Sequence, residues 1–171
     1  SNMAKQITSW TLQCAACSVR YPGLDPRYRC DCGGTLDVVH DLSAVRVDAA
    51  AFDARRASRN PLDRSGVWRF RELILPLGED TLNECIVTRG EGNTQLYEAS
   101  GIGRAIGVSR LQLKHEGENP TGSFKDRGMT AAISVAKHMG LKRVACASTG
   151  NTSASMASFA AIAGMQGVVF I

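Results

Sequence analysis

The sequence has no apolar run long enough to span a bilayer, and its first residues lack the basic-then-apolar pattern of a secretory signal peptide. Aromatic residues make up only 6% of its 171 residues and charged residues 21%, whereas hydrophobic residues make up 44%. That balance is typical of a globular chain and not of a disordered one. We therefore expect a cytoplasmic protein with no membrane partner. Ser1-Asn2 before Met3 resembles a tag remnant and is left aside.

The sequence also lacks a strong excess of either charge. The formal net charge is +4, and the basic residues are scattered rather than gathered in a stripe, so no nucleic-acid partner is expected. Neither a Gly-x-x-x-x-Gly-Lys-Ser/Thr motif nor a well-placed Gly-x-Gly-x-x-Gly motif occurs. These absences argue against a nucleotide-binding α/β domain.

Six cysteines are present, and four of them form two pairs near the start of the chain: Cys14 with Cys17, and Cys30 with Cys32. Four thiolates at this spacing can surround Zn²⁺ tetrahedrally, which would leave no open position for chemistry. The alternatives are a metal-free hairpin, or disulfides formed on purification. We predict a small Cys-rich, zinc-ribbon-like hairpin module over residues 1–40, with a structural role in each case.

The next segment, residues 41–110, has a helical and strand-forming character. Residues 48–59 carry Ala, Phe and Arg at helical spacing until Asn60-Pro61 interrupts them, and residues 68–73 read as a second short helix that ends before Pro76. Two further cysteines, Cys85 and Cys146, lie in apolar surroundings. We expect both to be buried strand residues.

From residue 111 onward, strand and helix patterns alternate. Strands are predicted at 111–114, 144–147 and 168–171, with helices between them that end at Gly140 and Gly164. Ser123 is expected to cap the first helix, with Asp126 completing a capping-box-like start. This alternation predicts an α/β fold with a parallel βαβαβ core over residues 111–171.

Two loops of this unit carry polar residues suited to chemistry. Lys125 lies in the first turn of the predicted helix, where the partial positive charge disfavours a second positive charge and so favours the neutral amine that attacks an aldehyde. The second loop, residues 148–153, joins a strand to a helix, and its hydroxyls and backbone amides can form an anion cradle. A capped surface helix and a plain helix cap are the non-catalytic alternatives.

The run Glu118-Asn119-Pro120-Thr121-Gly122-Ser123-Phe124-Lys125-Asp126-Arg127-Gly128-Met129 resembles the cofactor-lysine segment of threonine synthases, which are fold-type II pyridoxal phosphate (PLP) enzymes. The Cys-Asp-Cys-Gly-Gly segment and residues 89–96 are similar to further parts of that family, although Gln95 stands where proline is usual. The resemblance covers the chain from about Cys14 to its end. It implies a fold like that of the tryptophan synthase β-subunit.

The resemblance also implies roles for the loop residues. Lys125 would form the Schiff base with PLP, beside Ser123 and Phe124, and Asn151 would hydrogen-bond the cofactor's ring oxygen. Ser148, Thr149, Gly150 and Thr152 would hold the substrate's carboxylate or phosphate. The activity implied is conversion of O-phospho-L-homoserine and water to L-threonine and phosphate. Cysteate synthase or a serine/threonine dehydratase are the alternatives within the family, and a zinc-ribbon binding module is the alternative outside it.

The chain stops inside a predicted strand, Gly167-Val168-Val169-Phe170-Ile171. We therefore expect it to be the front part of a longer protein, truncated before the family's glycine-rich phosphate loop. In isolation it is expected to bind PLP weakly and to have no turnover, whereas the full-length protein is expected to form a homodimer.

Overall fold

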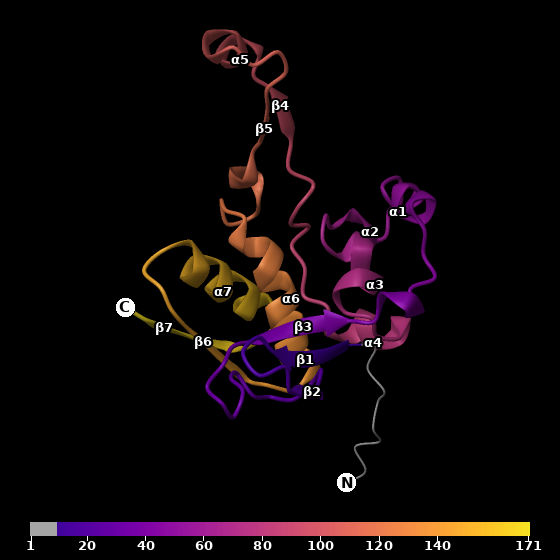
Figure 1. Ribbon diagram of the computed structural model, residues 1–171, viewed down its shortest axis with the longest axis vertical. Coiled ribbons are helices and arrows are strands. Elements are labelled where there is room, and N and C mark those ends of the chain that lie inside the picture. The colour runs from indigo at the N-terminus through magenta and orange to yellow at the C-terminus, as the bar shows by residue number, and fades with distance from the viewer. Residues whose placement is uncertain (1–9) are drawn as a thin grey trace.

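A computed structural model describes residues 10–171 of the chain. Figure 1 shows a cysteine-rich sheet and a group of short helices near the N-terminus, a pair of longer helices with a small sheet at the C-terminus, and an arm that projects away from both. No helix in residues 10–171 is both long and apolar enough to cross a membrane.

The cysteine-rich sheet consists of β1 (Trp10–Cys14), β2 (Arg20–Pro22) and β3 (Leu36–His40). The strands are antiparallel in the order β2-β1-β3, so that Leu12 lies opposite both Tyr21 and Val38. Trp10, at the start of β1, is buried in a core cluster with Trp68, Leu75, Leu82 and Cys85. The sheet therefore packs against the helical segment and shares a core with it.

The helical segment contains α1 (Ala49–Arg55), α2 (Pro61–Arg64), the short η2 turn (Trp68–Phe70) with α3 (Arg71–Ile74), and α4 (Glu79–Cys85). The side chain of Asp48 caps α1, which ends earlier than its composition predicted. Asn60 caps α2 with Pro61 in its first turn, so the predicted break starts a new helix.

The expected environment of the two isolated cysteines was partly wrong. Cys85 is buried, as expected, but it ends helix α4 and does not lie in a strand. Leu82 and Cys85 are the buried residues of α4 and are three positions apart, a helical period that a short apolar run does not reveal on its own. Cys146 does lie in a strand, where it is half-buried.

The projecting arm consists of β4 (Leu96–Glu98), α5 (Ser100–Ile106) and β5 (Gln112–Lys114) (Figure 1). This corrects the prediction that residues 111–114 begin the parallel core, because β5 pairs antiparallel with β4 and forms a separate sheet. The short connection through α5 brings the two strands together at a low cost in loop-closure entropy. The alternation of apolar and polar residues predicts that this segment is a strand, but it does not predict which strand pairs with it.

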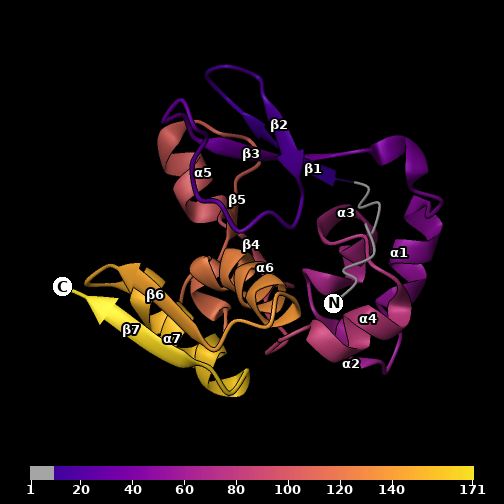
Figure 2. The same cartoon turned by 90° about the horizontal axis from the view of Figure 1, so that it is seen from below.

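The remaining part of the expected parallel unit is present. Helix α6 (Lys125–His138) leads to β6 (Arg143–Ala147), α7 (Asn151–Ile162) and β7 (Gln166–Phe170), and the two strands are parallel. Figure 2 shows α7 lying along one side of this strand pair, with α6 beside it. Phe159 and Met156 on α7 and Ile133 on α6 are almost completely buried and form the second core cluster.

Candidate functional site

The loop before α6 is fixed from several sides. Gly122 has φ +83°, a conformation that favours glycine. Asn119 is buried, and its side chain accepts a hydrogen bond from the Gly92 N–H (2.9 Å) and donates one to the Glu116 carbonyl (2.8 Å). Lys125 follows as the first residue of α6, half-buried, with its Nζ 4.7 Å from the centroid of the Phe124 ring. The loop thus presents a primary amine beside an exposed aromatic ring.

The predicted helix cap lies one residue away from its expected place. Phe124, not Ser123, occupies the N-cap position of α6, and no side-chain cap bond is made there. Ser123 is buried, and its Oγ accepts from the backbone N–H of Lys125 (3.3 Å). The side chain of Asp126 turns inward to tertiary partners, so the capping box does not form.

Asp126 is completely buried and connects the two predicted loops. Its carboxylate accepts hydrogen bonds from the backbone N–H of Thr121 (2.7 Å), from the Thr121 hydroxyl, and from the hydroxyl of Ser155 on α7 (2.5 Å). Ser155 lies one helical turn after Asn151, the first residue of α7. The Asp126 carboxylate therefore holds the start of α6 next to the start of α7. Sequence reasoning missed this role.

The loop between β6 and α7 has the features of an anion cradle. The Ser148 Oγ accepts from the Gly150 N–H (3.2 Å), and Asn151 is exposed at the start of α7. Within the described part of the chain, no side chain caps this helix. Its first amides are therefore available to an anionic group, which the helix N-terminus favours. Thr149 and Gly150 are exposed and Thr152 is half-buried beside them.

A second carboxylate, Glu116, fixes the loop from its other end. It accepts two hydrogen bonds from the Arg127 guanidinium (2.7 and 2.8 Å), one from the Thr94 hydroxyl (2.9 Å) and one from Asn119 (3.0 Å). These donors, Arg127 above all, lower the pKa of Glu116 to about 2. Arg127 is on the first turn of α6, so this ion pair positions the helix that carries Lys125.

The segment before β4 is built around a third carboxylate, that of Glu91, which is completely buried. Glu91 accepts hydrogen bonds from the hydroxyls of Ser65 (2.7 Å) and Thr88 (2.9 Å) and from the backbone N–H of Arg89 (2.8 Å). This part of the chain is thus a structural turn that binds residues 65–66 to residues 88–91. His115, for which no partner was foreseen, accepts from the Gly117 N–H through its Nδ1 atom (3.2 Å).

The four clustered cysteines come together in the structure. All four Sγ atoms lie within 4.8 Å of one another. The Sγ atoms of Cys14 and Cys32 are 3.6 Å apart, and those of Cys17 and Cys30 are 3.5 Å apart. Tetrahedral zinc with Zn–S bonds of about 2.3 Å places its sulfur ligands about 3.8 Å apart. The cluster could therefore hold a zinc ion.

Two neighbours suit this cluster to a metal. A Cβ atom at Gly34 would lie 2.7 Å from the Cys14 Sγ, so glycine lets the backbone approach the sulfur atoms. The Tyr21 hydroxyl lies 3.0 Å from the Cys30 Sγ and is the largest of several hydrogen-bond contributions that lower the pKa of that thiol to about 6. A thiolate is the form that binds zinc.

Comparison with known proteins agrees with this geometry. The family described as "Pyridoxal-phosphate dependent enzyme" matches residues 87–171. Residues 87–171 are thus similar to enzymes whose cofactor is pyridoxal phosphate. The matched segment includes the Lys125 loop, the Asp126 and Ser155 contact, and the loop that begins at Ser148.

Among curated proteins, the chain is similar to threonine synthases. It is 40% identical to that of Methanosarcina acetivorans over 161 residues, which are 94% of this chain and 36% of the relative. It is 37% identical to that of Methanocaldococcus jannaschii over 93% of this chain and 37% of the relative. It is 50% identical to that of Synechocystis over 63% of this chain and 29% of the relative. The chain thus spans about a third of the length of these relatives.

The contacts of Asp126 lead to a first prediction. In Asp126→Asn, one carboxylate oxygen becomes an NH₂ group that faces the donors of Thr121 or Ser155, so a buried donor loses its acceptor. We expect the free energy of unfolding to fall by about 1–3 kcal/mol in urea denaturation. Asp37→Asn, on the exposed side of β3, is the matched control. A change in Asp126→Asn no larger than that of the control would contradict this account.

The low pKa of Glu116 predicts an acid dependence of stability. Its pKa in the folded state, about 2, is below the ordinary value of 4.5, so its contribution is complete above about pH 4.5 and is lost as the pH falls toward 2. Urea unfolding across this range should show a steeper loss of stability for the natural chain than for Glu116→Gln. Glu84→Gln, at an exposed position on α4, should keep the natural slope. Parallel slopes for all three proteins would rule out this role.

The cysteine cluster predicts one zinc ion per chain. Metal analysis of protein prepared under reducing conditions should find about one equivalent of zinc. Cys30→Ser should remove it, whereas Cys85→Ser, at a buried position outside the cluster, should retain it. Zinc below about a tenth of an equivalent in the natural chain, after attempted loading, would favour the metal-free hairpin.

Proposed function

We propose that this chain forms part of a threonine synthase, a lyase that converts O-phospho-L-homoserine and water to L-threonine and phosphate. The observation that carries the proposal is the Asp126 carboxylate, which joins the loop before Lys125 to the helix that begins at Asn151. This contact puts an amine and an anion cradle next to each other. Similarity to threonine synthases supports the choice of reaction.

The residues present fit pyridoxal phosphate. Lys125 supplies the amine for the Schiff base, and Ser123 and Phe124 precede it in a loop where Gly122 leaves open space at its Cβ position. Asn151 offers an exposed amide to the ring oxygen. When bound, the cofactor supplies an electron sink for a negative charge that develops at the substrate's Cα atom.

The chain's own residues would bind and orient the substrate. Ser148, Thr149, Gly150 and Thr152 surround the uncapped start of α7, where hydroxyl and amide donors can hold the substrate's carboxylate or phosphate. With the cofactor bound, the Lys125 amine would hold and move protons at the substrate's Cα, Cβ and Cγ atoms, while phosphate would leave from Cγ and water would add at Cβ.

The four-cysteine cluster would act as a structural zinc site at a distance from this reaction. Its four sulfur atoms fill the coordination sphere of a tetrahedral ion, so no position remains for a substrate. Because Trp10 of β1 packs with Trp68 and Leu75, the metal would stabilise the sheet that supports this part of the core.

Spectroscopic titration tests the cofactor role of Lys125. Addition of pyridoxal phosphate to the full-length protein should give the visible absorption band of a Schiff base. Lys125→Ala should lack this band, and Lys137→Ala, at the far end of α6, should retain it. Absorption bands of equal intensity in the natural protein and in Lys125→Ala would contradict the proposal.

The reaction is tested separately by product analysis. The proposal expects phosphate and threonine from O-phospho-L-homoserine, and no sulfite-dependent phosphate release from O-phosphoserine. The opposite result would assign the protein to cysteate synthesis while leaving the cofactor site intact. Asn151→Ala should lower the activity by a factor of about 10–100, since it removes one directed hydrogen bond to the cofactor.

A further inference from the structure

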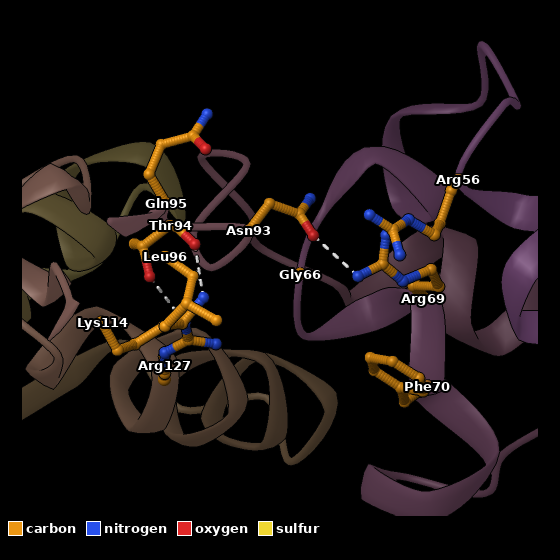
Figure 3. Close-up of a pocket in the computed structure, with 10 residues that line it drawn as sticks. All are labelled: Arg56, Gly66, Arg69, Phe70, Asn93, Thr94, Gln95, Leu96, Lys114 and Arg127. Atoms are coloured by element: carbon orange, nitrogen blue, oxygen red, sulfur yellow. Dashed lines mark hydrogen bonds between the residues drawn. The ribbon is translucent and has the colours of Figure 1, made fainter. Parts of the chain in front are cut away.

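A cavity of about 690 Å³ lies between the helical segment, the base of the projecting arm and the first turn of α6. Four cationic side chains line it: Arg56, Arg69, Lys114 and Arg127. No carboxylate is among the described residues that line it. Figure 3 shows Arg56 and Arg69 on one side of this space and Lys114 with Arg127 on the other. The lining includes Arg127 but neither Lys125 nor any residue of the loop at 148–152, so the cavity differs from the proposed cofactor site.

The cations on the two sides differ in how their charge is compensated. Arg127 is paired with Glu116 at 2.7 Å, and the Lys114 ammonium donates to the carbonyl of Thr94. Arg56 and Arg69 have no carboxylate within 4.0 Å in the described chain. The Arg69 guanidinium instead donates to the neutral side chain of Asn93 (2.7 Å).

The lack of a carboxylate partner distinguishes Arg56 and Arg69 from two arginines close to them in the sequence. Arg55, at the end of α1, makes an ion pair with Glu72 (2.6 Å), and Arg71, at the start of α3, makes one with Asp63 (2.7 Å). The carboxylates of Glu72 and Asp63 are thus paired with Arg55 and Arg71 and not with the two arginines at the cavity. The two guanidinium groups toward the cavity lie side by side (Figure 3), which leaves an excess of positive charge at its wall.

The arrangement has an electrostatic cost that a bound anion would remove. Burial lowers the pKa of Arg69, and the like charge of Arg56 lowers it further, while Asp53 opposes the shift. Two adjacent guanidinium groups offer planar sets of N–H donors that match the oxygens of a phosphate. A phosphate bound to both guanidinium groups would offset the repulsion between their positive charges, because its negative charge attracts each of them.

We propose that this cleft binds a phosphate-bearing small molecule, whose phosphate contacts Arg56 and Arg69. The volume is in the range of sites for small molecules and is much larger than a phosphate ion, so the rest of the ligand extends toward Lys114 and Thr94. The site is distinct from the proposed cofactor site, and its existence does not depend on the proposed reaction.

Calorimetric titration with inorganic phosphate and with pyrophosphate, at low salt and in the absence of pyridoxal phosphate, tests the proposal. Saturable binding in the millimolar range or tighter is expected, with pyrophosphate the tighter ligand. Arg56→Gln should weaken binding about tenfold, and the double variant R56Q/R69Q should abolish it. Arg56 is exposed and makes no ion pair in the described chain, so its substitution should leave the fold intact.

Two controls separate the cleft from general surface charge and from the cofactor site. The double variant R59Q/R104Q removes the same net charge at exposed positions and should bind phosphate as the natural chain does. Lys125→Ala should also bind phosphate normally. The proposal would be overturned by absence of saturation up to about 10 mM phosphate, by unchanged binding in Arg56→Gln, or by an equal loss in R59Q/R104Q.

Discussion

The buried carboxylate of Asp126 is the constraint on which the site depends. A charge inside a protein is tolerated when hydrogen bonds replace the water it has lost, and Asp126 takes these bonds from Thr121 and Ser155. Neither partner can move away without leaving the carboxylate exposed to an apolar interior. The loop before Lys125 and the start of α7 are therefore held together by a polar contact within the packed helices.

The same helix organises the surroundings of that contact. Farther along α6, the Thr130 hydroxyl accepts from the Trp68 indole N–H (2.7 Å) and donates to the Val87 carbonyl (2.7 Å), while Ser134 accepts from the Val87 N–H (2.8 Å). Two side chains one turn apart thus satisfy both backbone groups of a residue that belongs to no strand. Helix α6 replaces a neighbouring strand for this part of the chain, and so joins the helical segment to the C-terminal core.

Local features of the fold could be predicted from the sequence, but pairings and tertiary partners could not. The helix after Lys125 and the parallel pair of strands around α7 follow from periodicity and glycine positions. The partner of β5 does not, because strand alternation is the same for a parallel and an antiparallel neighbour. Asp126 has the spacing of a capping residue, and only the packing of α7 shows that it turns inward. Arg56 and Arg69 become neighbours through the fold of the helical segment, which their separation in sequence conceals.

The position of Trp10 has a consequence for how the parts of this protein can vary. Its indole is buried against Trp68 and Leu75, and a Cβ atom at Gly23 would lie 2.2 Å from the ring nitrogen, so the cysteine-rich sheet is shaped around a residue that belongs to the neighbouring core. The sheet therefore cannot be replaced without disturbing the core of the helical segment. Replacing it with a different sheet would require matching changes in the helices that pack against Trp10.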